Sequence, residues 1–545
     1  MWLAAITLLA LLRPGLGECY FPFEYHGTYA VQSARNQYSE VLIEINRILP
    51  YGVCHRRVGN NLILRDGSNG CLRCFHLAIR SANVLQLHTR DPQSSCATNS
   101  NATLRLCPTP DELRSAERMQ RGRIHELMMY KTKTRTAEPH AHQVYCPISG
   151  RFSFSYEADE AGGACRGAAS ELSNCPYGFG LHLHFRACSF RQQRNMTLQC
   201  LADWTDADGR HFVALMDVTA SESDRPRYRC AMYREELGSG RIFLAFSSDS
   251  SCHRQLVNAT HGHERLVLYA AVSHPWPPAV RRATCTFPDW AQGHWQHAHV
   301  DGNTIVYKDV ANFKSYTARC IGGQHEKFVI YSRSHCGEEM YNCIWLKERA
   351  VNVMEFQLGL MPSRRISNSL CGPHRFLDTG WITQGRSRIE HEARCPVSGS
   401  YSGVIPDTDG QLCARLRSDC TSSQSMFYTV TSCANASHIF EKREYRCLGS
   451  WTEGDVLYTY TQRRDALSYE CFVGRVMADG RVFIGEAGTD EGCRRRVDPT
   501  RTGMLITQTA PCRDGAETSE PPPPTVSAPT LASLVAALLL ARCFR

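Results

Sequence analysis

The sequence predicts a mainly β protein, built from tandem disulfide-rich antiparallel β-sandwich or barrel domains in two duplicated halves. Three observations predict it. The 545 residues include 27 cysteines, which a cytosolic protein would seldom keep. The cysteines and their neighbours repeat once along the chain. Short runs of β-branched and aromatic residues alternate with turn residues, as in antiparallel sheets.

The length and charge of the chain limit the classes of protein to consider. A chain of this length exceeds what one core can hold, so several domains are expected. The net charge of +8 at pH 7 is spread over the whole sequence. Such a weak, dispersed charge is not the signature of a nucleic-acid-binding protein. It favours anionic glycans, lipid headgroups or acidic proteins as partners.

The first 17 residues are typical of a secretory signal peptide. An apolar run from Trp2 to Leu12 is followed by Pro14 and by Gly15 and Gly17, which predicts cleavage before Glu18. A short buried helix is the alternative. N-glycosylation sequons fit the same compartment and stand at Asn101, Asn195, Asn258 and Asn435.

The strands are predicted from local sequence pattern. β-branched and aromatic runs occupy residues 40–45, 62–64, 211–215, 241–246, 304–307, 327–331 and 457–460. Two Asp-x-Asp-Gly segments, 206–209 and 407–410, are typical of hairpin turns. Two segments, Gly27-Thr-Tyr29 and Gly293-His-Trp295, have two interpretations. They resemble the Gly-x-Trp motif in the first strand of lipocalin-like barrels, or each is a core aromatic residue beside a turn glycine.

The internal repeat is shown by blocks of residues that recur in the same order. A Cys-x-Phe-Pro block, a Cys-Pro-Ile/Val-Ser-Gly block and a Cys-Leu-x-x-Trp-Thr block occupy residues 19–22, 146–150 and 200–205, and again 285–288, 395–399 and 447–452. Twelve cysteines of the first half match twelve of the second in order: Cys19, Cys54, Cys71, Cys74, Cys96, Cys146, Cys165, Cys175, Cys188, Cys200, Cys230 and Cys252 with Cys285, Cys320, Cys336, Cys343, Cys371, Cys395, Cys413, Cys420, Cys433, Cys447, Cys471 and Cys493.

The remaining cysteines and the cysteine counts bear on the pairing. Cys107 and Cys512 have no match in the repeat, and Cys543 lies in the C-terminal tail. Twenty-six cysteines are therefore disulfide candidates, and their connectivity stays open. Each half contains a five-cysteine and a seven-cysteine part. If every cysteine pairs within its half, at least one bridge joins the two parts of that half.

These patterns predict nine segments. They are a signal peptide (1–17), a cysteine-rich β-domain A1 (18–107), a charged linker with a helix-like start (108–145), β-domain B1 (146–270), a Pro-rich linker (271–284), β-domain A2 (285–394), β-domain B2 (395–512), a Pro-rich stalk (513–530) and an apolar C-terminal tail (531–545).

The C-terminal tail predicts a membrane attachment. Its apolar run from Leu531 to Ala541 is shorter than the ~20 residues of a spanning helix. It fits a glycolipid-anchor signal, with attachment candidates Asp514, Gly515 and Ser519. The alternatives are a marginal transmembrane helix, with Cys543 palmitoylated, and an apolar tail on a secreted protein.

No catalytic, cofactor-binding or metal-ligating residue is proposed from the sequence, because none of the common catalytic or nucleotide-binding motifs occurs. The Cys71-x-x-Cys74 spacing allows a redox or zinc pair, but a structural disulfide framework is favoured. The Asp-x-Asp-Gly segments could bind calcium, although solvated turns are favoured. Histidine clusters at His140, His142, His253, His261 and His263 are interpreted as surface loops. The basic runs 281–282 and 494–496 are interpreted as solvated surface residues. The functional alternative is that they attract sulfated glycans weakly.

The three recurring blocks resemble a family of uncharacterised invertebrate secreted or membrane proteins, described by consecutive domains of unknown function. The resemblance covers Cys19 to Cys512, implies a cell-surface ectodomain and supplies no catalytic residues.

The predicted function is a non-enzymatic cell-surface glycoprotein ectodomain with a receptor, co-receptor or adhesion role. Its partner would be an extracellular protein or glycan, without nucleic acid or cofactor. It would lie at the outer face of the plasma membrane, or be secreted if the tail is not an anchor. The alternatives are a lipocalin-like carrier of a small apolar ligand and an extracellular enzyme with an unrecognised site.

Overall fold

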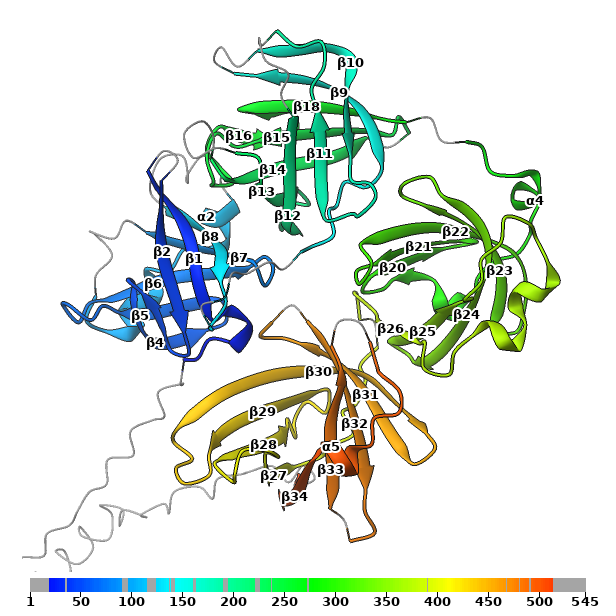
Figure 1. Cartoon of the computed structure of the whole chain (residues 1–545). Helices are drawn as coiled ribbons and strands as arrows, with labels where there is room; N and C mark the ends of the chain where they lie inside the picture. Colours follow the sequence, from blue (N-terminus) through cyan, green and yellow to red (C-terminus); the bar gives the residue numbers. More distant parts are fainter. Residues whose placement is uncertain are drawn as a thin grey trace, which may run out of the picture.

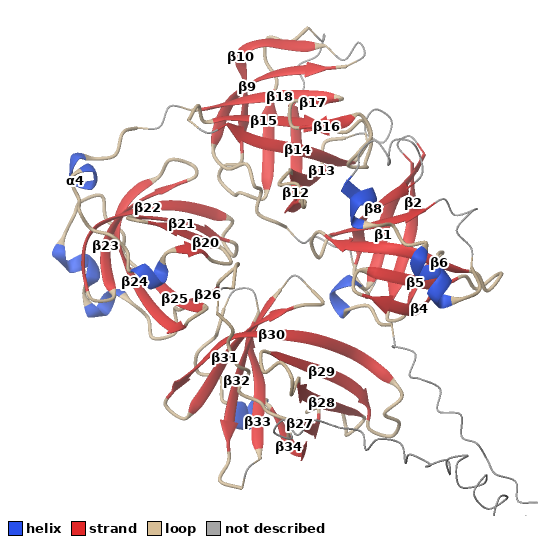
Figure 2. Cartoon of the chain, turned by 180° about the vertical axis from the view of Figure 1, so that it is seen from behind, coloured by secondary structure: helices blue, strands red, loops and turns tan. Residues whose placement is uncertain are grey.

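The structure of the chain is a computed structural model. It describes residues 19–512, except 35–36, 91–96, 115–123, 137, 139–142, 160–162, 190–194, 221–225, 237, 272–273, 390, 467, 480 and 490–491. Four antiparallel β-domains follow one another along the chain, and we call them A1, B1, A2 and B2 (Figures 1 and 2). The mainly β, tandem-domain architecture predicted from the sequence is confirmed.

The two domains of the first half are closed eight-stranded barrels. A1 contains β1 (Gly27–Ala34), β2 (Gln37–Glu44), β3 (Arg47–Leu49), β4 (Gly52–Val58), β5 (Asn61–Arg65), β6 (Leu72–Ile79), β7 (Val84–Arg90) and β8 (Ile124–Lys133), with short helices α1 (Ser100–Arg105) and α2 (Pro110–Arg114) before β8. B1 contains β9 (Arg151–Ala158), β10 (Ala164–Ser173), β11 (Gly180–His184), β12 (Asn195–Thr205), β13 (His211–Asp217), β14 (Tyr228–Glu236), β15 (Arg241–Phe246) and β18 (Glu264–Ala270), with a hairpin of β16 (Leu256–Asn258) and β17 (His261–Gly262) beside it.

The second half repeats this order with one difference, since A2 is an eight-stranded sheet that does not close and B2 is a closed barrel. Helix α4 (Pro278–Arg281) precedes A2 and α5 (Pro499–Thr502) lies in B2. A2 contains β19 (Gly293–His294), β20 (Ala298–Asp301), β21 (Thr304–Asp309), β22 (Lys314–Gln324), β23 (Lys327–Ser334), β24 (Glu339–Ala350), β25 (Val353–Leu358) and β26 (Ile382–Gly385). B2 contains β27 (Ser400–Val404), β28 (Leu412–Ser418), β29 (Ser425–Ser432), β30 (Ile439–Glu453), β31 (Val456–Arg463), β32 (Tyr469–Val476), β33 (Val482–Gly488) and β34 (Met504–Ala510).

Strand β8 corrects the charged linker predicted over residues 108–145. Residues 124–133 pair with both β7 and β1 and so close the A1 barrel. Met129 points into the A1 core, while Met128 and Tyr130 pack against B1. Both faces of the strand are therefore buried, so its sequence lacks the alternation that marks a half-exposed strand. Its charged flanks favoured the helix-like interpretation.

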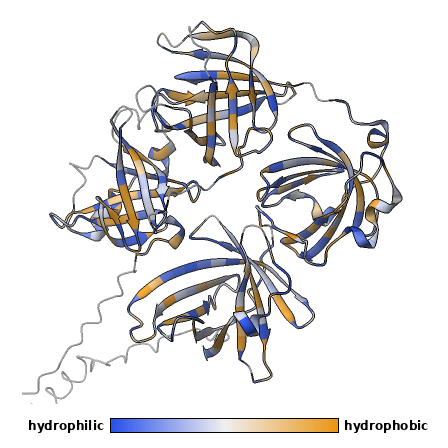
Figure 3. Cartoon of the chain, in the orientation of Figure 1, coloured by the Kyte–Doolittle hydropathy of each residue, from blue (hydrophilic) through white to orange (hydrophobic). Residues whose placement is uncertain are grey.

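Apolar side chains pack the barrel interiors. Hydrophobic and hydrophilic residues alternate along many of the strands (Figure 3), as expected where one face of a strand is buried. Tyr29 and Trp295 occupy matching places in A1 and A2. The Tyr29 hydroxyl donates to the Tyr25 carbonyl (3.0 Å), and the Trp295 indole donates to the Ala291 carbonyl (2.8 Å). Both rings are almost fully buried. They are therefore core aromatics that follow a turn glycine.

Gly27 explains why the repeat keeps a glycine at this distance from its first cysteine. Its φ is +136°, and a Cβ there would lie 2.3 Å from the Lys133 carbonyl oxygen. Only glycine lets β8 approach the start of β1 so closely.

The four domains form a ring around a common centre, and A1 lies beside both B1 and B2 (Figure 1). A1 meets B1 where the Tyr130 hydroxyl donates to the Ser250 carbonyl (2.6 Å). B1 meets A2 where Tyr145 donates to Ser315 (2.8 Å). A2 meets B2 through Val353, which joins the same apolar cluster as residues of B2. B2 meets A1 through an ion pair between Arg463 and Glu24 (2.9 Å).

Disulfides staple each domain, and every cysteine that the structure describes is bonded. Ten bridges form five matching pairs between the halves: Cys19–Cys54 with Cys285–Cys320, Cys74–Cys107 with Cys343–Cys371, Cys146–Cys200 with Cys395–Cys447, Cys165–Cys188 with Cys413–Cys433, and Cys230–Cys252 with Cys471–Cys493. Such extensive bonding indicates an extracellular or secreted protein.

Two expectations about the cysteines are corrected. Cys371 corresponds to Cys107, and not to Cys96 as counting in order suggested, because Cys371 and Cys107 bond the matching residues Cys343 and Cys74. The odd cysteine of the B1 part, Cys175, crosses to Cys336 of the other half. Its counterpart Cys420 bonds Cys512 within B2. Among the bridges between described cysteines, the one that leaves its domain therefore joins the two halves, and not the two parts of one half.

Among the residues that the structure describes, none of the helices has the length and apolar character needed to cross a membrane. The expected signal peptide, stalk and tail, with Asp514, Gly515, Ser519 and Cys543, lie outside the described residues, as do Cys96, His140 and His142.

Candidate functional site: a basic groove between A1 and B2

A groove of about 700 Å³ lies where the first and last domains meet. We call it the basic groove and define it by Tyr20, Arg57, Arg415, Arg417, Phe427, Tyr428, Lys442, Arg443, Glu444, Arg464 and Asp465. Tyr20 and Arg57 come from A1, and the other residues come from B2. Its volume falls within the range of ~300–1,000 Å³ that ligand pockets usually have.

Strand β28 presents two arginines to the basic groove through simple alternation. Ala414, Leu416 and Ser418 are buried, so Arg415 and Arg417 point outward. Neighbouring strands extend these positions into two rows across the sheet. Arg415 faces Thr429, which faces Lys442, and Arg417 faces Phe427, which faces Glu444.

Aromatic rings in the basic groove carry cations on their faces. The Arg417 guanidinium lies 5.3 Å from the ring centre of Phe427, and the Lys442 ammonium lies 5.3 Å from that of Tyr20. The second contact joins the two domains. Cation–π contacts of this kind hold the charges in place without neutralising them.

The charges of the groove are only partly compensated. Arg464 pairs with Glu444 (3.2 Å), and Arg443 pairs with Glu441 (2.7 Å). Arg57, Arg415 and Arg417 have no carboxylate within 4 Å among the described residues. Burial lowers the pKa of Arg57, and the charge of Asp465 only partly offsets it. The half-buried Arg57 donates from Nε to the Gly59 carbonyl (3.1 Å) but has no carboxylate partner, and a bound anion would offset its partial loss of hydration.

The first half does not repeat this arrangement. Ser402 faces Arg415 and Ser400 faces Arg417 in B2. In B1 the same positions carry Glu171, which faces Ser153, and Ser173, which faces Arg151. The paired arginines are therefore a property of B2 alone.

Sequence reasoning missed this groove. Arg415 and Arg417 alternate with apolar residues and form no basic run, and Arg57 belongs to the other half of the chain. Of the predicted basic runs, Arg281 and Arg282 are exposed at α4. Arg495 is buried in ion pairs with Glu355 (2.5 Å) and Glu453 (2.8 Å), so this run is not simply solvated.

Other residues singled out from the sequence fall into ordinary structural places. All four sequon asparagines are exposed, which leaves them accessible to a glycan: Asn101, Asn195, Asn258 and Asn435. Cys74 bonds Cys107, and Cys71 is also disulfide-bonded, so neither is a free thiol. Asp206 accepts hydrogen bonds from the backbone of Asp208 (3.0 Å) and Arg210 (2.9 Å), as a turn aspartate does.

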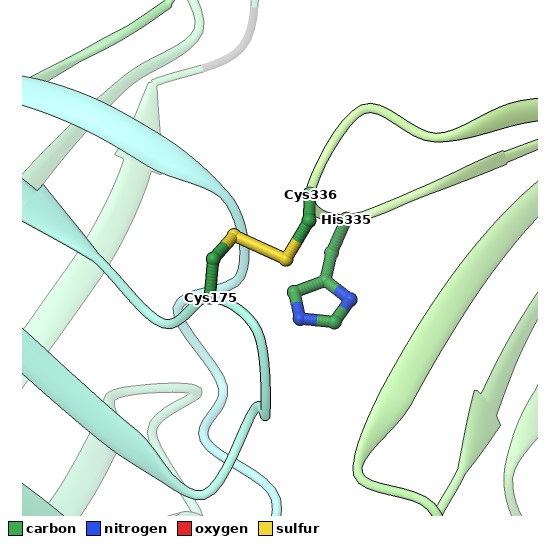
Figure 4. Close-up of side chains that lie close together, drawn as sticks. All are labelled: Cys175, His335 and Cys336. Carbon is green, nitrogen blue, oxygen red and sulfur yellow. A yellow bond between two sulfur atoms is a disulfide. The ribbon is translucent and has the colours of Figure 1, made fainter.

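Cys175, His335 and Cys336 come together at the junction between B1 and A2 (Figure 4). Their spacing alone would suit a metal ion. The two sulfurs are bonded to each other, however, so they offer no thiolates and the cluster is a covalent bridge.

Replacing both Cys175 and Cys336 by serine is expected to lower the free energy of unfolding by about 2–4 kcal/mol, because the bridge closes a loop of 161 residues. Chemical denaturation of the full chain measures the change. Reduction of the other bridges must be excluded by counting free thiols. A change below about 0.5 kcal/mol would show that the hydrogen bonds of Tyr145 already hold this junction.

A second cavity, of about 280 Å³, lies in the open sheet of A2 and is lined mainly by apolar side chains such as Ile305, Ile330 and Phe356. It is the observation that favours the carrier alternative. Its volume is slightly below the usual range for ligand pockets, and the carrier function stays a prediction.

Four family models match the chain in succession, each described as a domain of unknown function. They are DUF7044 over residues 17–112, DUF7042 over 142–270, DUF7043 over 281–383 and DUF7045 over 395–499. These segments match A1, B1, A2 and B2 in order, although the first ends before β8 and the last before β34. The resemblance to tandem domains of unknown function is confirmed. An invertebrate origin stays a prediction. Neither the curated proteins nor the solved structures contain a match to the chain.

Proposed function

We propose that this chain, which belongs to the proteins built from the consecutive domains of unknown function DUF7044, DUF7042, DUF7043 and DUF7045, is a non-enzymatic extracellular binding protein. In this proposal the basic groove between A1 and B2 holds an anionic glycan. The observation that carries the proposal is the set of three arginines, Arg57, Arg415 and Arg417, which line the groove without carboxylate partners among the described residues.

The chemistry of the groove favours sulfate groups on a glycan. Guanidinium groups match planar or tetrahedral oxyanions with two parallel hydrogen bonds, and they are weakly hydrated, so they surrender water readily. One outward row of β28, β29 and β30 places Thr429 between Arg415 and Lys442, and the other runs from Arg417 over the ring of Phe427 to Glu444, which pairs with Arg464. An extended chain with repeated sulfates can meet several of these cations at once.

Attachment to the outer face of a membrane belongs to the same proposal. It rests on the sequence of the C-terminal tail. N-glycans on the exposed sequon asparagines would complete a cell-surface glycoprotein with a receptor, co-receptor or adhesion role.

Replacing Arg415 and Arg417 together by glutamine is expected to weaken binding of heparin, used as a sulfated probe, by at least about tenfold. Hydrogen bonds to charged groups contribute about 1.5–3 kcal/mol each, and exposure reduces this value. The salt dependence of binding should also become shallower, because fewer counterions are released. Titration calorimetry at several salt concentrations measures both quantities.

The matched control is the double replacement of Arg281 and Arg282 by glutamine, which removes the same charge from an exposed site at α4. Its heparin affinity should stay within about twofold of the wild type. Equal weakening by both variants would reduce the effect to net charge and contradict a specific groove. Absence of heparin binding by the wild-type chain would contradict the glycan proposal itself.

A further inference from the structure

Three metal-ligating side chains lie in a row across adjacent strands of A1. His76 on β6 is directly opposite His88 on β7, and His88 is directly opposite Glu126 on β8. Each residue of the row is next in sequence to a leucine that points into the A1 core: Leu77, Leu87 and Leu127. Because side chains alternate along a strand, the row lies on the outer face of the barrel. That face meets B1, whose Cys252 amide donates to Glu126. Strands β7 and β8 lie on the B1 side of A1 in Figure 1.

The row faces a cavity of about 280 Å³ between the two domains. His76, His88, Glu126 and His253 all line it, together with Trp204 of B1. The cavity has no part in the basic groove, which lies between A1 and B2.

His88 is the unusual member of the row. Its side chain is buried, with 4% of the residue exposed. Neither ring nitrogen has a hydrogen-bond partner among the described residues. Buried polar groups are nearly always paired, so an unpaired imidazole on a cavity wall points to a missing partner. Its Nε2 lies 3.9 Å from Glu126 Oε1.

His76 is oriented by a hydrogen bond that frees its other nitrogen. Its Nδ1 lies 2.9 Å from the Asn61 side-chain oxygen. An amide oxygen only accepts, so Nδ1 carries the hydrogen and Nε2 keeps its lone pair. Metal-bound histidines are held in their tautomer in this way. The rings of His76 and His88 lie with their centres 6.3 Å apart.

Glu126 is held from behind by residues of B1. Its Oε2 accepts hydrogen bonds from the Cys252 amide (2.9 Å) and from His253 Nδ1 (2.7 Å). Its Oε1 faces His88 and also accepts a hydrogen bond from the Gln86 side chain. Ligating carboxylates are commonly fixed through their second oxygen by such outer partners.

The second half of the chain lacks these ligands. The position of His76, two residues after Cys74, is taken by Trp345, two residues after Cys343. Trp345 is directly opposite Gln357, which stands in the place of His88. Trp345 also packs on Trp381, with ring centres 4.9 Å apart. Here the outer face carries aromatic packing, so the His–His–Glu row belongs to the first half alone.

We infer that His76 Nε2, His88 Nε2 and Glu126 Oε1 form a binding site for a divalent transition-metal ion of the zinc type, at the junction of A1 and B1. Two imidazoles and one carboxylate are an ordinary zinc ligand set, and three protein ligands leave a fourth position open to the cavity. Ligand atoms around tetrahedral zinc lie about 3.3 Å apart. The 3.9 Å between His88 and Glu126 therefore has to shorten by about 0.6 Å. The three ligand atoms do not all lie within 4.8 Å of one another among the described residues, so the His76 side chain has to move towards the other two when the ion binds.

The test uses the full chain without a histidine tag, treated with EDTA and dialysed. Zn²⁺ is titrated in competition with a chromophoric chelator, and Co²⁺ is added separately for its visible absorption. We expect one Zn²⁺ per chain and the absorption of a four-coordinate Co²⁺ with nitrogen and oxygen ligands. His88→Gln should weaken Zn²⁺ binding by more than about 100-fold, since even loss of an outer-shell partner costs about 10–100-fold.

Two further variants separate a metal site from general effects. His253→Gln should weaken Zn²⁺ binding by about 10–100-fold without abolishing it, because His253 acts only through Glu126. His299→Gln is the matched control: His299 stacks on the opposite His294 in A2, with ring centres 4.0 Å apart, and should leave binding unchanged.

Three results would overturn the inference. One is the absence of a stoichiometric Zn²⁺ site in the wild-type chain. Another is equal Zn²⁺ affinity of His88→Gln and the wild type, when both melt at the same temperature in EDTA. The third is a sulfur-to-cobalt charge-transfer band, which needs no variant and would place the metal on cysteines. None of these results depends on heparin binding at the basic groove.

Discussion

Replacing Arg463 by methionine is expected to destabilise B2 by about 3–5 kcal/mol and to open its contact with A1. The Arg463 side chain is 0% exposed and pairs with Glu24 of A1 (2.9 Å), Asp465 (2.6 Å) and Glu470 (3.0 Å). Burial alone would lower the pKa of Arg463, but the hydrogen bond and charge of Asp465 and the charge of Glu24 raise it above its ordinary value. Removing one partner of a buried ion pair leaves uncompensated charge, which accounts for the size of the loss.

Hydrogen exchange of the full chain measures this effect where it occurs. The backbone amides of β31 and β32, which carry Arg463 and Glu470, should exchange faster, and so should those near Glu24. Arg464→Met is the matched control, because Arg464 is exposed and its one ion pair among the described residues is with Glu444 at the surface. Such pairs contribute about 0–1 kcal/mol. Faster exchange in B2 without any change near Glu24 would contradict the role of Arg463 in closing the ring.

The two junctions between the halves are closed by different chemistry. B1 meets A2 through the covalent Cys175–Cys336 bridge, whereas B2 meets A1 through the ion pair of Arg463. The basic groove lies at the non-covalent junction. A binding site between two domains needs surfaces that can adjust to a partner, and an ion-paired junction allows this more readily than a disulfide.

The architecture of the chain was predictable from its sequence to the extent that it depends on local pattern. The Cys-Leu-x-x-Trp-Thr block marks the same strand in both halves, and the turn at Asp206 follows it as expected. Strand β8 was missed because burial on both faces removes alternation. The partner of Cys175 was missed because the parity of cysteine counts does not say which domains touch in space.

The candidate sites depended on contacts that no local pattern records. Arg57 and Arg415 line one groove only because the chain closes into a ring. His76, His88 and Glu126 are too irregularly spaced in sequence to suggest a ligand set, and they align only once the register of three strands is known. The histidine cluster around His253 was visible, but its partner Glu126 fell in a segment interpreted as a linker.

Replacing Glu355 by glutamine is expected to destabilise the junction of A2 and B2 by about 3 kcal/mol or more. Glu355 is completely buried and accepts hydrogen bonds from Arg349 (2.6 Å), Arg495 (2.5 Å) and the Thr383 hydroxyl (2.8 Å). The variant keeps the shape but removes the charge that two buried guanidinium groups share, and only Glu453 would remain for both. Glu348→Gln is the control on the same domain, because Glu348 is exposed and its replacement should cost less than about 0.5 kcal/mol.

The first half shows why the loss depends on the second arginine. Gln86 stands where Glu355 does and accepts two hydrogen bonds from Arg80 (2.8 and 2.6 Å). The charges of Glu126 and Asp206 also act on Arg80, so a neutral amide suffices at this position. The double replacement Glu355→Gln with Arg495→Met leaves Arg349 facing an amide, as Arg80 does in the first half. Denaturation of the four chains of this cycle should therefore give a double variant that loses less stability than the sum of the two single variants, by about 1 kcal/mol or more. Strict additivity would mean that Glu355 and Arg495 act independently, and that the charge of Glu355 is needed for Arg349 alone.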